Sequence, residues 1–184
     1  MLVRELKKTR GVIDEIRLMR SWSEWAAKTR QAYLDAILKL PPEERHRNRG
    51  ASFPSVQNIY EHILGAHIHW YEHIVLNWKV DDNLPGDREL NDDELRYLAA
   101  RVNKAVDEVM NTLTPEKLGK TYTAEWGKGQ KKVKVEECLA DIIWHLLEEQ
   151  TQHIGELNAL FWQMDRDPPL QDWFSSSLSM SKRK

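Results

Sequence analysis

Three side chains near the end of the sequence have the types and the spacing of metal ligands. In the segment WHLLEEQTQHIGELNAL, residues 144–160, His145, Glu149 and His153 follow one another in steps of four. Four residues advance about 400° around an α-helix, so the three side chains share one helix face. Imidazole nitrogens and carboxylate oxygens bind divalent transition metals, so this face is a candidate for one half of a metal site.

A second group of histidines offers the other half, because one helical turn presents only two adjacent side chains at bonding distance. Four of the seven histidines lie between His62 and His73. His62 and His69 face the same side of a helix to within about 20°, whereas His67 lies about 140° away from His62. His46 lies in a polar connection, where we expect it to be solvated and without a partner.

Antiparallel packing of the two histidine-bearing segments would bring the two halves together. The start of the segment 55–79 would then lie opposite the second half of the segment 135–164. This register predicts that His62, Glu149 and His153 bind one divalent metal, with the pair His69 and His145 forming a polar layer beside it. Two imidazoles, one carboxylate and an open position suit zinc or nickel in a site without redox features.

A rival ligand set stays open at this point. His69 and His73 form a His-x-x-x-His pair of their own, and His145 is a possible third ligand for it. A Glu-x-x-x-His pair such as Glu149 and His153 is also common on solvated helix faces without any metal. The spacing alone favours the first set only slightly.

The elements that must position these residues are almost entirely helical. Apolar residues recur with a helical period in four segments, predicted as the principal helices 19–40, 55–79, 92–113 and 135–164. Residues 1–17 predict an accessory helix, the stretch TYTAEWGKGQKKVKVEE predicts a short hairpin or an extended loop, and residues 170–184 form a Ser-rich tail. We therefore predict an all-α four-helix bundle, with residues 1–184 as a single domain.

The composition excludes several other classes of protein. Lys and Arg number 27 against 29 Asp and Glu, a net charge of −2 without the basic surplus of a nucleic-acid-binding protein. Cys138 is the only cysteine, which excludes an intrachain disulfide and a thiolate zinc site, and its apolar surroundings predict a small buried side chain. Without a signal-peptide pattern or an apolar run of about 20 residues, we expect a cytoplasmic protein with no membrane partner.

Two segments resemble the DinB-like metal-binding bundles. FPSVQNIYEHILGAHIHWYEHI is similar to their second helix, in which a Ser or Thr start is followed by a metal-binding histidine, here His62. EEQTQHIGELNALFWQMDRDPP is similar to their last helix, whose familiar form is His-x-x-x-His-Arg-Gly-Gln-Leu. His153 and the Gly and Leu after it fit this form, whereas Ile154 and Glu156 replace the Arg and Gln. The resemblance covers roughly residues 19–169.

The resemblance implies a ligand set and a class of chemistry. Glu149 stands where many relatives carry a third histidine, and the mycothiol-dependent maleylpyruvate isomerase branch has a similar His, Glu, His set. It implies metal binding by His62, Glu149 and His153 in an up-down-down-up four-helix bundle that is often dimeric. Some relatives use the metal to activate a small thiol such as mycothiol or bacillithiol.

These observations together predict a metal-dependent enzyme that acts on a small molecule, by thiol transfer or by hydrolysis, with no catalytic side chain assigned. The alternative is a non-enzymatic metal-binding or protein-interaction bundle of a stress response. A cleft beside an open metal position would favour the enzyme, and a fourth protein ligand would favour a structural metal.

Overall fold

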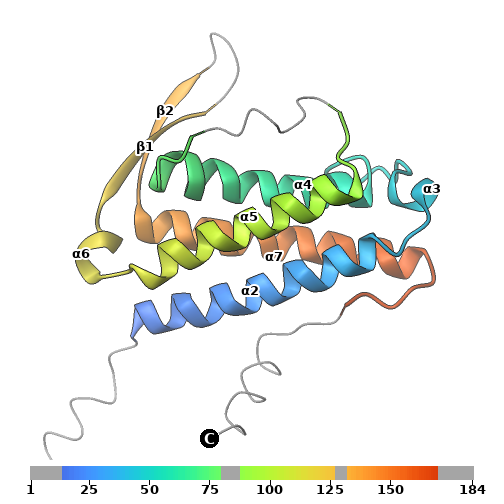
Figure 1. Ribbon diagram of the computed structural model, residues 1–184, viewed down its shortest axis with the longest axis horizontal. Coiled ribbons are helices and arrows are strands. Elements are labelled where there is room, and N and C mark those ends of the chain that lie inside the picture. The colour runs from blue at the N-terminus through green and yellow to red at the C-terminus, as the bar shows by residue number, and fades with distance from the viewer. Residues whose placement is uncertain (1–13, 80–87, 127–131, 170–184) are drawn as a thin grey trace, which may run out of the picture.

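The computed structural model describes residues 14–79, 88–126 and 132–169, and most of these residues are helical (Figure 1). The long helical elements are α2 (Glu15–Ile37), α4 (Val56–His67) continued by η1 (Ile68–Val75), α5 (Asp92–Asn111) and α7 (Leu139–Gln163). Two single-turn helices, α3 (Pro42–Arg45) and α6 (Pro115–Leu118), lie in the connections. The predicted helical character is therefore confirmed.

A small antiparallel sheet precedes α7, as the alternating sequence predicts. Strand β1 (Thr121–Trp126) pairs with β2 (Val133–Cys138), with Ala124 opposite Val135. The predicted start of the last helix at Val135 is wrong, because the backbone of residues 133–138 pairs with β1 and the helix begins only at Leu139.

Two further sequence predictions need correction near the start of the chain and at the cysteine. Residues 14–17 belong to the cap and first turn of α2, and the rest of the predicted accessory helix, residues 1–13, lies outside the described residues, as does the tail 170–184. Cys138 is half-buried rather than buried, because it ends an exposed strand, and its Sγ donates to Asp141 Oδ2 at 3.0 Å.

Polar caps fix where the long helices begin. Ser55 Oγ accepts from the backbone N–H of Asn58 at the start of α4, as predicted. Asn91 caps α5, and the Asn91 N–H donates in turn to Glu94 Oε2. This capping box satisfies N–H donors that the first helical turn leaves without partners. These caps therefore fix the first turn of α4 and of α5.

The four long elements lie side by side and enclose an apolar core (Figure 1). α4 packs against α7 and α5, and α2 packs against α5 and α7. The core is made of aliphatic and aromatic side chains from all four, among them Met19, Tyr33, Ile59, Ile63, Leu95, Val102, Ile143, Leu146 and Leu157. Burial of these side chains, at roughly 1.5–3 kcal/mol each for the larger ones, is the main force that holds the helices together.

The predicted regular helix from 55 to 79 becomes a π-helix after His67. η1 spans Ile68–Val75, and three consecutive residues within it, Trp70, Tyr71 and Glu72, are buried. Glu72 is fully buried and lies 2.6 Å from Arg101 Nε of α5. The wider turn of a π-helix changes which residues share a face, so the 3.6-residue spacing cannot be extended past His67.

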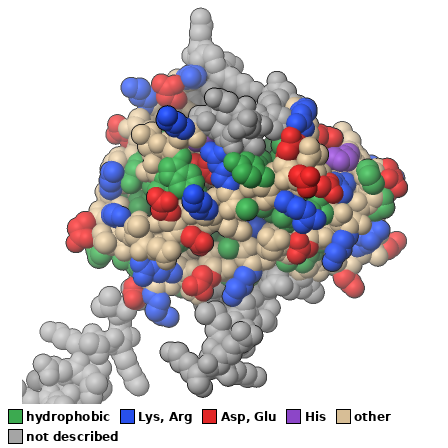
Figure 2. Space-filling view, in the orientation of Figure 1, with side chains coloured by type: hydrophobic (Ala, Val, Ile, Leu, Met, Phe, Trp, Pro, Cys, Tyr) green, Lys and Arg blue, Asp and Glu red, His purple; other side chains and the backbone are tan. Residues whose placement is uncertain are grey.

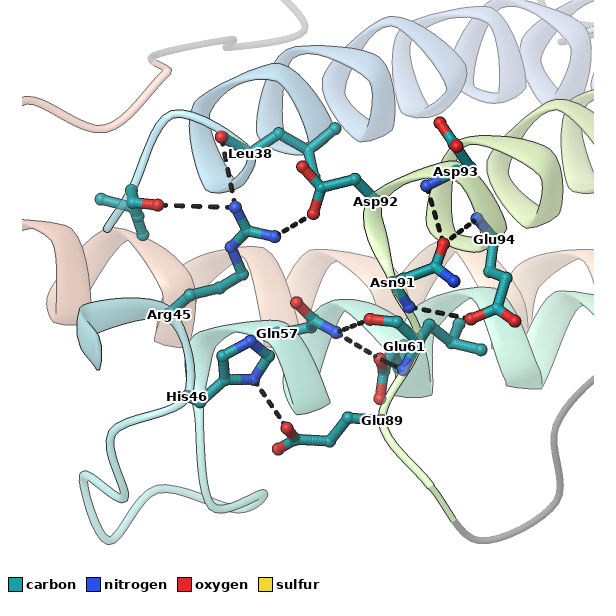
Figure 3. A network of polar contacts seen from close by, with 12 residues as sticks. Leu38, Arg45, His46, Gln57, Glu61, Glu89, Asn91, Asp92, Asp93 and Glu94 are labelled. Carbon is teal, nitrogen blue, oxygen red and sulfur yellow. Dashed lines mark hydrogen bonds and ion pairs between the residues drawn. The ribbon is translucent and has the colours of Figure 1, made fainter. Parts of the chain in front are cut away.

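One end of the molecule is closed by polar contacts among α3, α4 and the start of α5 (Figure 3). Arg45 of α3 forms an ion pair with Asp92, and Gln57 Nε2 donates to Glu61 Oε1 at 2.8 Å. His46 Nδ1 lies 2.9 Å from Glu89 Oε2. The expectation that His46 has no partner is therefore wrong, because the folded chain brings the segment before α5 against the polar connection.

A buried arginine of α2, Arg30, links this helix to α4, α5 and α7. Arg30 Nη1 donates to Gln150 Oε1 at 2.7 Å and lies 3.3 Å from His67 Nε2, and Arg30 Nη2 donates to Asn103 Oδ1 at 2.9 Å. His67 Nδ1 donates to the Ile63 carbonyl at 2.9 Å, so its Nε2 accepts from Arg30. His67 is thereby occupied inside the core, away from the helix face that carries His62, as its angular position predicts.

The native state should lose stability in acid through His67. Burial first, and then the Arg30 charge, lower the pKa of His67 from 6.5 to about 3. As the pH falls below 6.5, the unfolded chain takes up a proton that the native state refuses. This residue therefore lowers the free energy of unfolding by up to about 1.4 kcal/mol per pH unit down to pH 3. Urea unfolding of His67→Gln between pH 7 and 4 should show a shallower dependence, and an unchanged slope would contradict this role.

Candidate metal centre

Helices α4 and α7 bring the three predicted ligands together. His62 Nε2 of α4 lies 2.7 Å from Glu149 Oε1 of α7, and His153 Nε2 lies 3.2 Å from the same oxygen. One ligand atom from each of the three side chains lies within 4.8 Å of the others. Farther along, Trp70 meets His145 at 6.2 Å between ring centroids, so α4 and η1 run antiparallel to α7.

The chemistry of this cluster fits a divalent cation. His153 Nδ1 lies 2.7 Å from Glu156 Oε2, to which it donates, so the Nε2 of a neutral His153 carries a lone pair. That lone pair and Glu149 Oε1 face each other, and two acceptors repel unless a proton or a metal ion lies between them. A carboxylate bonded to the remote nitrogen of a ligating histidine is the usual support of zinc-type sites.

The connection between α3 and α4 holds the cluster from outside. Ser52 Oγ donates to Glu156 Oε2 at 2.6 Å, and the Ser52 N–H donates to Oε1 at 3.3 Å. The Phe53 ring stacks on His62, with centroids 4.0 Å apart and planes at 25°. Both imidazoles are therefore oriented before any ligand arrives.

These supporting residues were not predicted from the sequence. Glu156 carried a usable signal, since a carboxylate three residues after a metal-binding histidine lies on the same helix face. Ser52 and Phe53 lie in an irregular connection, where no periodicity indicates which way a side chain points.

The electrostatics of the cluster keep its carboxylates ionised. Burial alone would raise the pKa of Glu149, but hydrogen bonds and charge from His62 and His153 outweigh it and hold the pKa below its ordinary value. Burial opposes the same shift at Glu156, where bonds from Ser52 and His153 lower the pKa. The Glu149 side chain is 22% exposed and that of His153 is 10% exposed, so solvent reaches the carboxylate more readily than the imidazole.

The other histidines do not assemble the rival site. In the part of the chain that the structure describes, the ligand atoms of His69, His73 and His145 do not lie close enough together to bind one metal ion. His145 instead forms a second, more exposed group with Glu148 and Glu149. His69 and His145 both line the pocket beside the cluster, where the polar layer was predicted.

A pocket of about 680 Å³ opens directly from the cluster. It lies between α4 with η1, strand β2 and α7, and His62 and Glu149 form part of its wall. A volume of this size accommodates a small organic molecule. The ligand cluster therefore borders a space in which such a molecule could reach a bound metal.

The fold and this geometry define a class of protein. It is largely helical and carries a group of two histidines and one glutamate that could hold a divalent metal ion. A model of the DinB family matches residues 15–179, and the chain belongs to that family. None of the curated proteins matches the chain. Among the described residues, no helix has the length and apolar character to cross a membrane.

Substitutions on α7 should separate the two ligand sets. Glu149→Gln removes the charge that a ligating carboxylate supplies. Loss of a residue that only hydrogen-bonds to a ligand typically weakens metal affinity by roughly 10–100-fold. We expect the loss of a ligand in Glu149→Gln to weaken zinc affinity by at least as much. Glu149→His should restore affinity by forming a three-imidazole site, and His145→Ala should bind nearly as tightly as the wild type. Competition titration with a chelating dye measures all three. If Glu149→Gln keeps the zinc affinity of the wild type and His145→Ala loses it, the result would favour the rival ligand set of His69, His73 and His145.

Proposed function

We propose that this protein is a metal-dependent enzyme that acts on a small molecule at a divalent metal held by His62, Glu149 and His153. The proposal is supported by the position of the ligand group at the pocket, because His62 and Glu149 also line the 680 Å³ pocket. Among the described residues, no fourth His, Cys, Asp or Glu joins the group. Three protein ligands beside an accessible space are typical of catalytic rather than structural zinc sites.

Two reactions suit this site, the transfer of a small thiol and hydrolysis. A bound divalent cation lowers the pKa of a coordinated thiol or water, which supplies the nucleophile at neutral pH. Glu156 fixes the tautomer of His153, so that its Nε2, which lies 3.2 Å from Glu149 Oε1, is free to bind a metal ion. Trp70 and Ile142 add apolar surface to the wall of the pocket beside the cluster. Cys138 lies outside the pocket lining and the ligand group.

The finer features of the proposal follow from the donor set and the family. We propose zinc or nickel as the resident metal, since two imidazoles and one carboxylate suit both. We also propose one domain with up-down-down-up helix order, a homodimer and a cytoplasmic location. Nucleic acid is not a proposed partner, because charges of both signs are interspersed on the face drawn in Figure 2 and the net charge is −2.

Cobalt substitution tests the proposed reaction class. Cobalt-loaded protein titrated with 2-mercaptoethanol, cysteamine and glutathione should develop a strong thiolate-to-metal absorption. Its intensity should rise with pH until the bound thiol is fully deprotonated, because the thiolate is the ligand. His153→Ala, loaded in the same way, is the matched control and should give no such band. Failure of every thiol to change the spectrum would remove thiol transfer and leave hydrolysis, whereas failure to load cobalt would remove the metal site itself.

A further inference from the structure

The pocket beside the metal cluster has two chemically different ends. His62 and Glu149 lie at one end, and Glu137 of β2 and Asp141 of the first turn of α7 lie at the other. Glu149 and Asp141 are eight residues apart on one helix, which places them roughly 12 Å apart along its axis. The pocket thus extends from the proposed metal-binding residues to strand β2 of the hairpin.

The wall between these ends is mostly apolar and lined by small residues on one side. The apolar part of the lining comes from Gly65, Ala66, Trp70, Val135 and Ile142, and His69 and His145 line the pocket as well. A Cβ added at Gly65 would meet no atom within 4 Å, so the glycine leaves open space rather than a tight helix contact. This middle section suits a hydrocarbon chain or a flat ring.

The far end of the pocket carries negative charge. Glu137 and Asp141 both line it, and among the described residues the lining contains no Lys or Arg. The two described lysines nearest to this end in sequence interact with Glu125 instead. Lys132, just before β2, has its Nζ 3.0 Å from Glu125 Oε2, and the charge of Lys134 in β2 also lowers the pKa of Glu125. Burial and the charge of His73 lower the pKa of His69, so this imidazole adds little positive charge at neutral pH.

We propose that the pocket selects an elongated substrate with a cationic amine at the end remote from its reacting group. This inference rests on the proposed function, since the reacting group is the one that meets the metal held by His62 and Glu149. The ammonium group donates hydrogen bonds to Glu137 and Asp141, and the apolar middle of the substrate lies against Trp70. A substrate with a carboxylate at that end is rejected by like charge.

Three probes with one metal-binding head and different tails test this specificity. They are 6-aminohexanohydroxamic acid, hexanohydroxamic acid and the monohydroxamic acid of adipic acid, titrated calorimetrically into zinc-loaded protein. We expect the amine to bind roughly tenfold tighter than the neutral probe, as charge-assisted hydrogen bonds permit. The carboxylate probe should bind more weakly than the neutral one. Gly65→Leu should weaken all three by filling the middle of the pocket.

Substitution of the two carboxylates assigns the preference to this end of the pocket. Glu137→Gln/Asp141→Asn should bind the amine and the neutral probe equally, with the affinity for hexanohydroxamic acid unchanged. Glu136→Gln is the matched control, because Glu136 is an exposed neighbour on β2 that alternates to the other face of the strand. It should keep the full preference for the amine.

Separate measurements distinguish failure of this inference from failure of the metal site. Equal binding of all three hydroxamates, or an amine preference that survives Glu137→Gln/Asp141→Asn, would overturn the amine assignment and leave the metal centre intact. If elemental analysis shows no zinc in the loaded protein, the proposed function fails. Titration of metal-free protein with hexylamine, hexan-1-ol and hexanoate, followed through the Trp70 indole NMR signal, then still decides the charge preference. A response to hexylamine no stronger than to hexanoate overturns it.

Discussion

Replacement of either histidine of the proposed ligand group with alanine is expected to abolish stoichiometric metal binding. Wild-type protein should carry one divalent ion per chain, and His62→Ala and His153→Ala should carry almost none after dialysis. In the proposed site His62 is the ligand from α4, and without it Glu149 and His153 offer only two donors from one helix. Elemental analysis of the dialysed proteins measures the difference directly.

His46→Ala provides the matched control for these variants. His46 is also partly exposed and also paired with a carboxylate, that of Glu89, but it lies outside the ligand group. Its metal content should equal that of the wild type. Circular dichroism should confirm that all three variants remain helical, and equal metal content in all of them would refute the ligand assignment.

Arg30→Ala is expected to cause the largest loss of stability. The guanidinium serves His67, Gln150 and Asn103, and its removal leaves three inward-facing acceptors without their donor. At about 1–3 kcal/mol for each buried group left unsatisfied, the free energy of unfolding should fall by at least about 3 kcal/mol. That is a large fraction of the roughly 5–15 kcal/mol that stabilises a typical domain. Urea denaturation measures the change.

Arg17→Ala is the control for this loss, because Arg17 is an exposed residue of the same helix. Its effect should stay within about 0.5 kcal/mol, as for most surface substitutions. Burial already lowers the pKa of Arg30 to about 10, which reflects the cost of placing this charge in the core. Equal stability of Arg30→Ala and the wild type would contradict the prediction. It would mean that the cost of burying the guanidinium charge cancels the contribution of its hydrogen bonds.

The helical part of the fold and the ligand cluster were predictable because both depend on regular spacing. Steps of four place Glu149 and His153 on one helix face, and an antiparallel register then leaves His62 opposite them. The start of α4 at Ser55 was equally accessible, since a serine that caps a helix acts through its own neighbours. Such features need only local geometry and one assumption about how two helices pack.

The remaining features depend on tertiary contacts that periodicity does not encode. Val135 fits a helical pattern as well as a strand, and only its pairing with Ala124 decides between them. The sequence alone would place Arg30 on the surface, as it would most arginines. Its burial depends on acceptors that three separate helices supply. Ser52 and Phe53 gain their roles from the position of an irregular connection over the cluster, which no local pattern specifies.

If His62, Glu149 and His153 bind a metal ion as proposed, their separation along the chain would link metal supply to the amount of folded protein. His62 and Glu149 are 87 residues apart, so the full ligand set exists only after α4 and α7 have docked. A ligand that binds only the native state stabilises it, by about 2.7 kcal/mol when its free concentration is 100 times the dissociation constant. In a cell short of the metal, unfolded chains would therefore be more frequent and more often degraded. Metal starvation would then reduce the abundance of the protein as well as its activity.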